Sequence, residues 1–178
     1  GVTARLLARG KEEGLEGVTF SPAVERVGSG ALAPHVLGRV GAMSPEQWEE
    51  LKRKGYAMEE TVGKDGAEAA FEEALHGTPG RRYVETAGSG WDTEPVAGKN
   101  VTLTLDKDLQ AAAQDALQAF LDGHPNASGG AVVALDVEDG GVLAMASLPG
   151  YDPETFSKQY GALAQDEGHP MMNRAIQG

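Results

Sequence analysis

We first ask whether the sequence contains a serine that could act as a catalytic nucleophile. A serine nucleophile needs a base within hydrogen-bond reach, and Ser-x-x-Lys on a helix places both side chains on one face. No serine of this chain has a lysine three residues later. Thr61-Val62-Gly63-Lys64 has the spacing with threonine, but its glycine disfavours a helix. Neither Gly-x-Ser-x-Gly nor Gly-x-x-x-x-Gly-Lys occurs, so we predict no catalytic serine and no phosphate-binding loop.

Carboxylates and imidazoles give a weaker signal. The four histidines lie far apart, without metal-ligand spacing on one helix face, so we predict neither a metal nor a cofactor. One alternative left open is an unrecognised hydrolase built around Asp136, Asp152 and His169, with paired carboxylates in a deep pocket. Aspartates in turns also make local hydrogen bonds, and we expect that role for Asp136 and Asp152.

Composition narrows the function further. The 178 residues carry a formal net charge of −12, which makes nucleic acid and anionic membrane surfaces improbable partners. Cysteine is absent, so disulfides, thiolate zinc sites and cysteine nucleophiles are excluded. No apolar run approaches the ~18 residues of a membrane span. A hydrophobic fraction of 40% is sufficient for a folded core.

Local signals predict an α+β fold. Ser44, Pro45 and Gln47 form a capping box that starts a helix. Further predicted helices, turns and strands are the helices 2–13, 65–76 and 106–122, a helical turn at 31–35, an extended stretch at 17–22, and strands at 36–43, 82–87, 101–105, 130–136 and 142–148. The glycines of the 137–141 turn predict that the last two strands form a hairpin.

Two of the predicted helices have regular apolar faces. In the helix 65–76, Asp65 is the expected cap, and apolar residues recur at helical spacing from Ala67 to Leu75. In the helix after Asp106, the expected face is Leu109, Ala112, Ala113, Ala116, Leu117 and Phe120.

A change of charge divides the chain near Pro95-Val96-Ala97-Gly98. Residues 1–99 carry 12 basic and 16 acidic residues, whereas residues 100–178 carry 3 and 11. Proline and glycine at this point are typical of a linker. We therefore predict two units, residues 1–97 and 98–178.

Five segments in order, from about residue 18 to the end, together resemble the class B penicillin-binding proteins, which are bacterial peptidoglycan transpeptidases. The stretch 44–64 is most similar to the elongation-type branch of that family. The segments are Arg26 with Ala33-Pro34-His35-Val36-Leu37-Gly38-Arg39-Val40-Gly41; Gly63-Lys64-Asp65-Gly66-Ala67-Glu68 with Leu75-His76-Gly77; Leu103-Thr104-Leu105-Asp106-Lys107-Asp108-Leu109-Gln110; Gly130-Ala131-Val132-Val133-Ala134-Leu135-Asp136 with Gly141-Val142-Leu143-Ala144-Met145-Ala146-Ser147; and Asn173-Arg174-Ala175-Ile176-Gln177-Gly178.

The resemblance implies different roles for the two units. Residues 1–97 resemble the family's non-catalytic pedestal, also called its dimerisation domain, with the N-terminal part missing. Residues 98–178 resemble the first helix and hairpin of the transpeptidase head, cut before the catalytic serine. In the family the Ser-x-x-Lys motif follows within about ten residues of the Asn-Arg-Ala segment, and Ser-x-Asn and Lys-Thr-Gly come later. All three motifs are absent here, so we expect this chain by itself not to be an enzyme.

The same resemblance implies a setting and partners. The parent would cross-link peptidoglycan through a serine acyl-enzyme, bind penicillin, and be anchored in the bacterial membrane with this region on the extracytoplasmic face. Its pedestal would contact a RodA-type glycan polymerase and an MreC-like scaffold. Arg26 and Glu68 match family positions that bridge pedestal segments. If both are buried they should pair, because an unpaired buried charge is costly.

Two further expectations concern the chain taken alone. The hairpin 130–148 lacks the strands that would continue its sheet, so we expect self-association through its open edge. The remaining alternative is a stand-alone module that binds a protein or peptidoglycan.

Overall fold

The computed structural model describes residues 28, 30–85 and 88–177. The predicted helix 2–13, the extended stretch 17–22 and Arg26 lie outside these residues. Three two-stranded antiparallel sheets are formed by the described chain. Its strands are β1 (Val40–Ala42), β2 (Thr61–Gly63), β3 (Arg81–Glu85), β4 (Gly88–Thr93), β5 (Gly130–Leu135) and β6 (Val142–Leu148).

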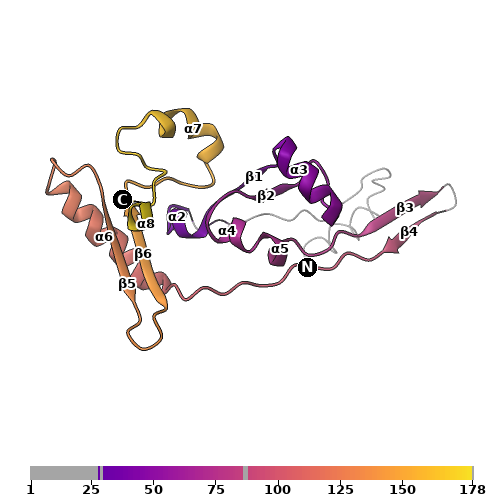
Figure 1. The fold of residues 1–178 in the computed structure, drawn as a ribbon, viewed down its shortest axis with the longest axis horizontal. Helices are drawn as coiled ribbons and strands as arrows, with labels where there is room; N and C mark the ends of the chain where they lie inside the picture. The colour runs from indigo at the N-terminus through magenta and orange to yellow at the C-terminus, as the bar shows by residue number, and fades with distance from the viewer. Residues whose placement is uncertain (1–27, 29, 86–87, 178) are drawn as a thin grey trace, which may run out of the picture.

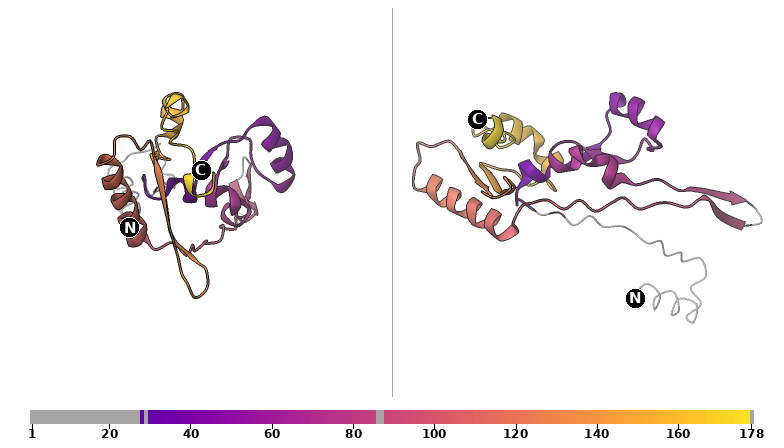
Figure 2. Two further views of the ribbon diagram at one scale, coloured as in Figure 1. Left: turned by 60° about the vertical axis from the view of Figure 1, so that its left-hand side comes forward. Right: turned by 60° about the horizontal axis from the view of Figure 1, so that its bottom comes forward.

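The described part of the chain is elongated, as Figures 1 and 2 show. The β3–β4 hairpin lies at one end, and α6 with β5 and β6 lies at the other. An extended connection, residues 94–106, runs back from β4 to α6. The helices are α2 (Pro34–Leu37), α3 (Pro45–Leu51), the 3-10 helix η1 (Lys52–Lys54), α4 (Gly66–Ala70), α5 (Glu72–His76), α6 (Lys107–Asp122), α7 (Phe156–Gln165) and α8 (Arg174–Gln177).

We call residues 40–97 the N-terminal unit, residues 106–177 the C-terminal unit, and residues 31–39 the joining segment. The boundary predicted at residues 97 and 98 falls within the extended connection. The joining segment precedes β1 in sequence, but it also contacts α6 and α7 of the C-terminal unit. The two-unit division at residue 97 stays a prediction.

The helix start at Ser44 is confirmed. The Ser44 hydroxyl accepts from Gln47 N at 3.2 Å, and Ser44 N donates to Gln47 Oε1 at 3.1 Å. This reciprocal pair satisfies backbone donors that have no partner within the helix. The Gln47 side chain also accepts from Lys64 Nζ. The cap therefore fixes α3 against the segment that follows β2.

The predicted continuous helix 65–76 is wrong. It divides into α4 and α5, because Phe71 has φ −112° and ψ 15° and interrupts the helix. Asp65 makes no capping hydrogen bond with its side chain; its Oδ1 accepts from Arg39 N at 2.9 Å instead. The expected apolar face is not buried either, since Phe71 is 42% exposed.

The strand predicted at 101–105 is also absent from the described chain. These residues belong to the extended connection, where Thr104 Oγ1 donates to Val142 O and Asp106 N donates to Leu143 O at 2.9 Å. Gln110 occupies the next part of the β6 edge, with hydrogen bonds to the backbone of Met145. A further strand on this side would therefore displace the start of α6.

The C-terminal hairpin is confirmed. β5 and β6 pair from Gly130↔Leu148 to Leu135↔Val142, and Gly140 in the turn has φ 77°. Asp106 caps α6 by accepting from Leu109 N at 2.8 Å. Helix α6 packs on β6, and Ala144 and Ala146 of that strand are buried.

The buried face of α6 differs from the predicted one. Gln110 and Leu117 are the buried residues of this helix, whereas Leu109 and Phe120 are 40% and 55% exposed. Leu117 belongs to the predicted face, but the face that meets the sheet is rotated by roughly a quarter of a turn from the centre of the apolar stripe. Gln110 faces the sheet because its side-chain amide makes hydrogen bonds with two backbone groups of β6.

Candidate functional site

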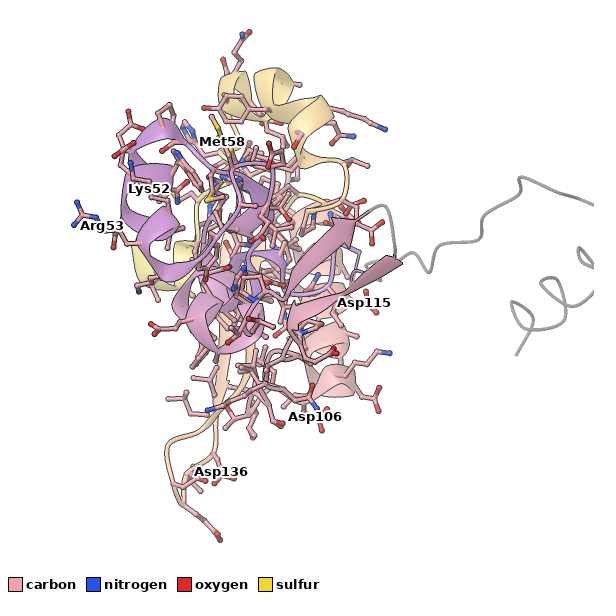
Figure 3. All side chains as sticks on the ribbon, turned by 90° about the vertical axis from the view of Figure 1, so that its right-hand side faces the viewer. Lys52, Arg53, Met58, Asp106, Asp115 and Asp136 are labelled. Atoms are coloured by element: carbon pink, nitrogen blue, oxygen red, sulfur yellow. The ribbon has the colours of Figure 1, made fainter. Side chains whose placement is uncertain are left out.

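The residues of the hydrolase alternative do not form a site. Asp136 Oδ1 accepts from Glu138 N at 2.8 Å, and Asp152 Oδ1 accepts from Glu154 N at 2.9 Å. Figure 3 places Asp136 at the tip of the β5–β6 hairpin, and His169 lies in a separate turn with φ 46°. Within the described residues no hydrogen bond or ion pair joins these three side chains. Both aspartates stabilise local turns, as their sequence context predicted.

The predicted pair of Arg26 with Glu68 stays a prediction, because Arg26 lies outside the described residues. Glu68 lies in the first turn of α4 and is partly buried. The α4 backbone at Glu68 approaches Gly63 so closely that a Cβ on Gly63 would overlap the Glu68 carbonyl. The helix therefore rests directly on β2 at this point.

A cluster of titratable side chains joins the end of α5 to the loop before β2. His76 Nε2 is 2.6 Å from Glu60 Oε2, and the His76 ring stacks on the Tyr56 ring with centroids 3.6 Å apart. Tyr56 is 6% exposed, and burial, followed by the negative charge of Glu72, raises its pKa to about 12. Its phenol therefore remains protonated at neutral pH. The cluster fixes the loop before β2 onto α5.

A second feature is an apolar groove on the N-terminal unit. It runs between α4–α5 and the extended connection, and its apolar walls include Phe71, Ala74 and Val96. Val96 is 62% exposed and Phe71 is 42% exposed. Glu73 and Lys99, which carry opposite charges, also line it. Exposed apolar side chains rimmed by charges are typical of protein-docking surfaces.

Backbone contacts hold the two walls of this groove together. Thr78 and Val96 exchange backbone hydrogen bonds of 2.9 Å in both directions, and Lys99 N donates to Ala74 O at 2.7 Å. Gly98 is packed against Leu75 so tightly that a Cβ there would overlap the Leu75 carbonyl. The groove is therefore a preformed surface, which lowers the entropy lost when a partner binds.

Comparison with known proteins assigns the family. The family described as the penicillin-binding protein dimerisation domain matches residues 3–103. The peptidoglycan D,D-transpeptidase MrdA of Salmonella typhimurium is 38% identical over 164 residues, which cover 84% of this chain and 25% of that protein. MrdA of Escherichia coli K12 is 37% identical over the same length. This chain belongs to the class B penicillin-binding proteins of the elongation type.

Solved structures of penicillin-binding proteins agree with the α+β fold. PBP2 of Pseudomonas aeruginosa, solved in complex with WCK 5153, is 32% identical with a TM-score of 0.69, over 91% of this chain and 33% of that one. PBP2 of Helicobacter pylori, solved in complex with MreC, is 29% identical with a TM-score of 0.65, over 84% of this chain and 28% of that one.

This penicillin-binding protein chain matches only part of each curated relative. It spans about a quarter of the length of the MrdA relatives that it matches. None of the helices in its described residues is long and apolar enough to cross a membrane. Those residues also hold no group of three side chains suited to a metal ion.

Sequence reasoning missed the contacts that tie the joining segment to the C-terminal unit. They involve Arg39, Gln114 and Phe156. The sequence held a usable signal for two of them, because Arg39 interrupts an apolar run and Gln114 lies four residues after Gln110 on an alanine-rich helix. Polar residues in such settings usually have a specific partner.

Proposed function

We propose that this chain is the non-catalytic pedestal and the first part of the transpeptidase head of an elongation-type peptidoglycan D,D-transpeptidase. In this proposal the N-terminal unit stands on the extracytoplasmic side of the bacterial membrane and docks a scaffold protein of the MreC type. The head is completed by sequence that carries the serine nucleophile. A RodA-type glycan polymerase would be a second partner of the parent protein.

The observation that carries the docking role is the preformed apolar groove beside Phe71 and Val96. It lies within residues 3–103, which match the dimerisation-domain family. The relative from Helicobacter pylori has been solved as a complex with MreC, which supports a partner of the same kind here. No feature of the described residues favours the stand-alone module or the hydrolase over this role.

Intact mass spectrometry after incubation with a penicillin tests the catalytic part of the proposal. We expect one covalent penicillin adduct on the full-length gene product and none on residues 1–178, because the latter lack a serine with a lysine base. An adduct on residues 1–178 would reveal a reactive residue within them. Absence of an adduct on both proteins would favour a binding module.

Binding of the MreC-like protein from the same organism tests the docking part. Val96→Asp places a charge in the groove, and we expect the Kd to rise at least about tenfold, as for a central interface residue. Val137→Asp is the matched control, because Val137 is 98% exposed on the distant hairpin turn. Equal binding by wild-type protein and both variants would remove the groove from the proposal.

A further inference from the structure

The joining segment, residues 31–39, is held by the C-terminal unit at two separate places. The first contact is made by Arg39. Its guanidinium carbon lies 3.9 Å from the centroid of the Phe156 ring, at the start of α7. Phe156 is only 7% exposed, so the cation meets the aromatic face away from most of the solvent. A planar guanidinium suits this stacked arrangement better than an ammonium does.

Arg39 is at the same time fixed to the N-terminal unit. Asp65 Oδ1 accepts from Arg39 N at 2.9 Å, and Asp65 Oδ2 lies 3.1 Å from Arg39 Nε. Lys64 N donates to Arg39 O at 2.8 Å. Because Arg39 directly precedes β1 and Asp65 follows β2, the β1–β2 sheet and this side chain must move together. Arg39 thus connects that sheet to Phe156.

An aromatic cluster extends the first contact. The His35 ring meets the Tyr151 ring edge-on with centroids 5.2 Å apart, and Tyr151 meets Phe156 at 5.3 Å. His35 Nε2 lies 2.7 Å from Pro170 O, a carbonyl that can only accept, so His35 donates this hydrogen bond. Tyr151 is 7% exposed. The joining segment is therefore packed among buried side chains of the C-terminal unit.

The second contact is made by glutamines of α6. Gln114 Oε1 accepts from Ala33 N at 2.9 Å, and Gln114 Nε2 donates to Ala31 O at 3.0 Å. Gln110 donates to Gln114 Oε1 at 3.0 Å and also binds the backbone of Met145 in β6. The side-chain amides thus link β6, through α6, to the start of the joining segment.

Ala33 shows that the second contact constrains the backbone. It has φ 49° and ψ 43°, a left-handed conformation that residues with a Cβ adopt rarely. It is also 4% exposed. Such a residue keeps this conformation only where its surroundings impose it, and the Gln114 amide bonds the backbone on both sides of Leu32.

We propose that the joining segment is a two-point joint that fixes the orientation of the N-terminal unit relative to the C-terminal unit. Arg39, between Asp65 and Phe156, is one point, and Ala33, held by Gln114, is the other. Units connected only by extended chain are expected to move against each other. The joint removes that freedom, so a change at the β1–β2 sheet is transmitted to Tyr151 and Phe156. This inference goes beyond the proposed function, since it requires neither a partner nor a substrate.

Pulsed electron paramagnetic resonance on the full-length gene product tests the joint. Spin labels are attached through Arg53→Cys on η1 and Asp115→Cys on α6, two exposed positions labelled in Figure 3. Residues 1–178 contain no native cysteine to interfere, and any cysteine elsewhere is replaced. We expect one narrow distance distribution, and a distribution about twofold broader or more in both Arg39→Ala and Gln114→Leu. Lys52→Ala, which removes an ion pair internal to the α3–η1 region, is the matched control and should leave the width unchanged.

Two results would overturn the joint. One is a distribution as narrow as that of the unsubstituted protein in both Arg39→Ala and Gln114→Leu. The other is broadening in only one of them, which would reduce the two-point joint to a single contact. If Arg39→Ala loses its folded circular dichroism spectrum, Arg39→Lys replaces it, because lysine keeps the charge beside Asp65 but not the planar stacking on Phe156. An unchanged width in Arg39→Lys would then overturn the Arg39 point. Because no penicillin or MreC-like protein is used, the outcome is independent of the proposed function.

Discussion

The C-terminal unit and the β1–β2 sheet of the N-terminal unit differ in the length of their regular elements and in the contacts that hold them together. The C-terminal unit has a helix of 16 residues and strands of 6 and 7 residues, whereas strands β1 and β2 have 3 residues each. Short elements make few hydrogen bonds of their own, so they need support from distant residues. Around the β1–β2 sheet this support comes from polar side chains. Asp65 accepts a hydrogen bond from Arg39 N, Glu72 accepts one from Gly63 N, and Glu60 lies within hydrogen-bond distance of His76 Nε2.

The two outer edges of the C-terminal hairpin also differ in the contacts that they make. Gln110 and Asp106 occupy the outer edge of β6. In the described chain, β5 hydrogen-bonds to no segment except β6, and its Val133 and Leu135 are 45% and 55% exposed. An uncovered strand with apolar side chains favours pairing with another strand. A local helix therefore protects one edge and nothing described protects the other.

The largest effect is expected at the edge of β6 that Gln110 covers. Gln110→Leu removes both hydrogen bonds to Met145 and leaves two partly buried backbone groups unpaired, so the free energy of unfolding should fall by about 3 kcal/mol. Urea denaturation measures this change. Gln118→Leu on the exposed side of α6 is the control and should change stability by less than about 0.5 kcal/mol. Similar losses in both variants would show that α6 closes the edge without Gln110.

A smaller effect is expected for the polar support of the N-terminal unit. Asp65→Ala removes a hydrogen bond to Arg39 N and an ion pair to its side chain, and should lower the free energy of unfolding by about 1.5 kcal/mol. Glu73→Ala removes the exposed ion pair with Lys54 and should have almost no effect. If the two variants were equally stable, long-range polar contacts would not distinguish this unit from the other.

The uncovered edge of β5 predicts self-association of residues 1–178. Light scattering coupled to sizing should show a concentration-dependent dimer, and Val133→Lys should raise its dissociation constant about tenfold, because a lysine on an edge strand opposes pairing. Met58→Lys provides a control at another exposed apolar residue away from the hairpin, at 60% exposure. A monomer at all concentrations would contradict the prediction.

The smallest effect is a pH dependence located in the joining segment. Burial lowers the pKa of His35 below its ordinary value, so the unfolded chain takes up a proton there more readily than the folded protein does. This contribution to stability is fully present above about pH 6.5 and is lost as the pH falls through the lowered pKa. Comparing unfolding of the original protein and His35→Gln at pH 7.5 and 5.5 measures it. The variant should lose part of the difference, whereas His124→Gln, at an exposed site, should retain it.

Three features that are formed by residues close together in the sequence were predicted from the sequence alone. The capping box at Ser44, the cap at Asp106 and the glycine turn between β5 and β6 are each formed within a few residues, and all three are confirmed. The penicillin-binding protein family was likewise identified from ordered segments of sequence and is confirmed by its relatives. These features need no knowledge of what lies across the molecule.

Tertiary structure alone decided where several polar side chains bind. Asp65 could cap α4 or bind Arg39, and the approach of β1 to β2 decided for Arg39. The apolar stripe of α6 could have met the sheet, but the unpaired backbone at Met145 selected the Gln110 face. Leaving both backbone groups of Met145 without partners would cost about 1–3 kcal/mol each, against roughly 1.5–3 kcal/mol for one exposed leucine, and these groups can be located only once the strand is in place.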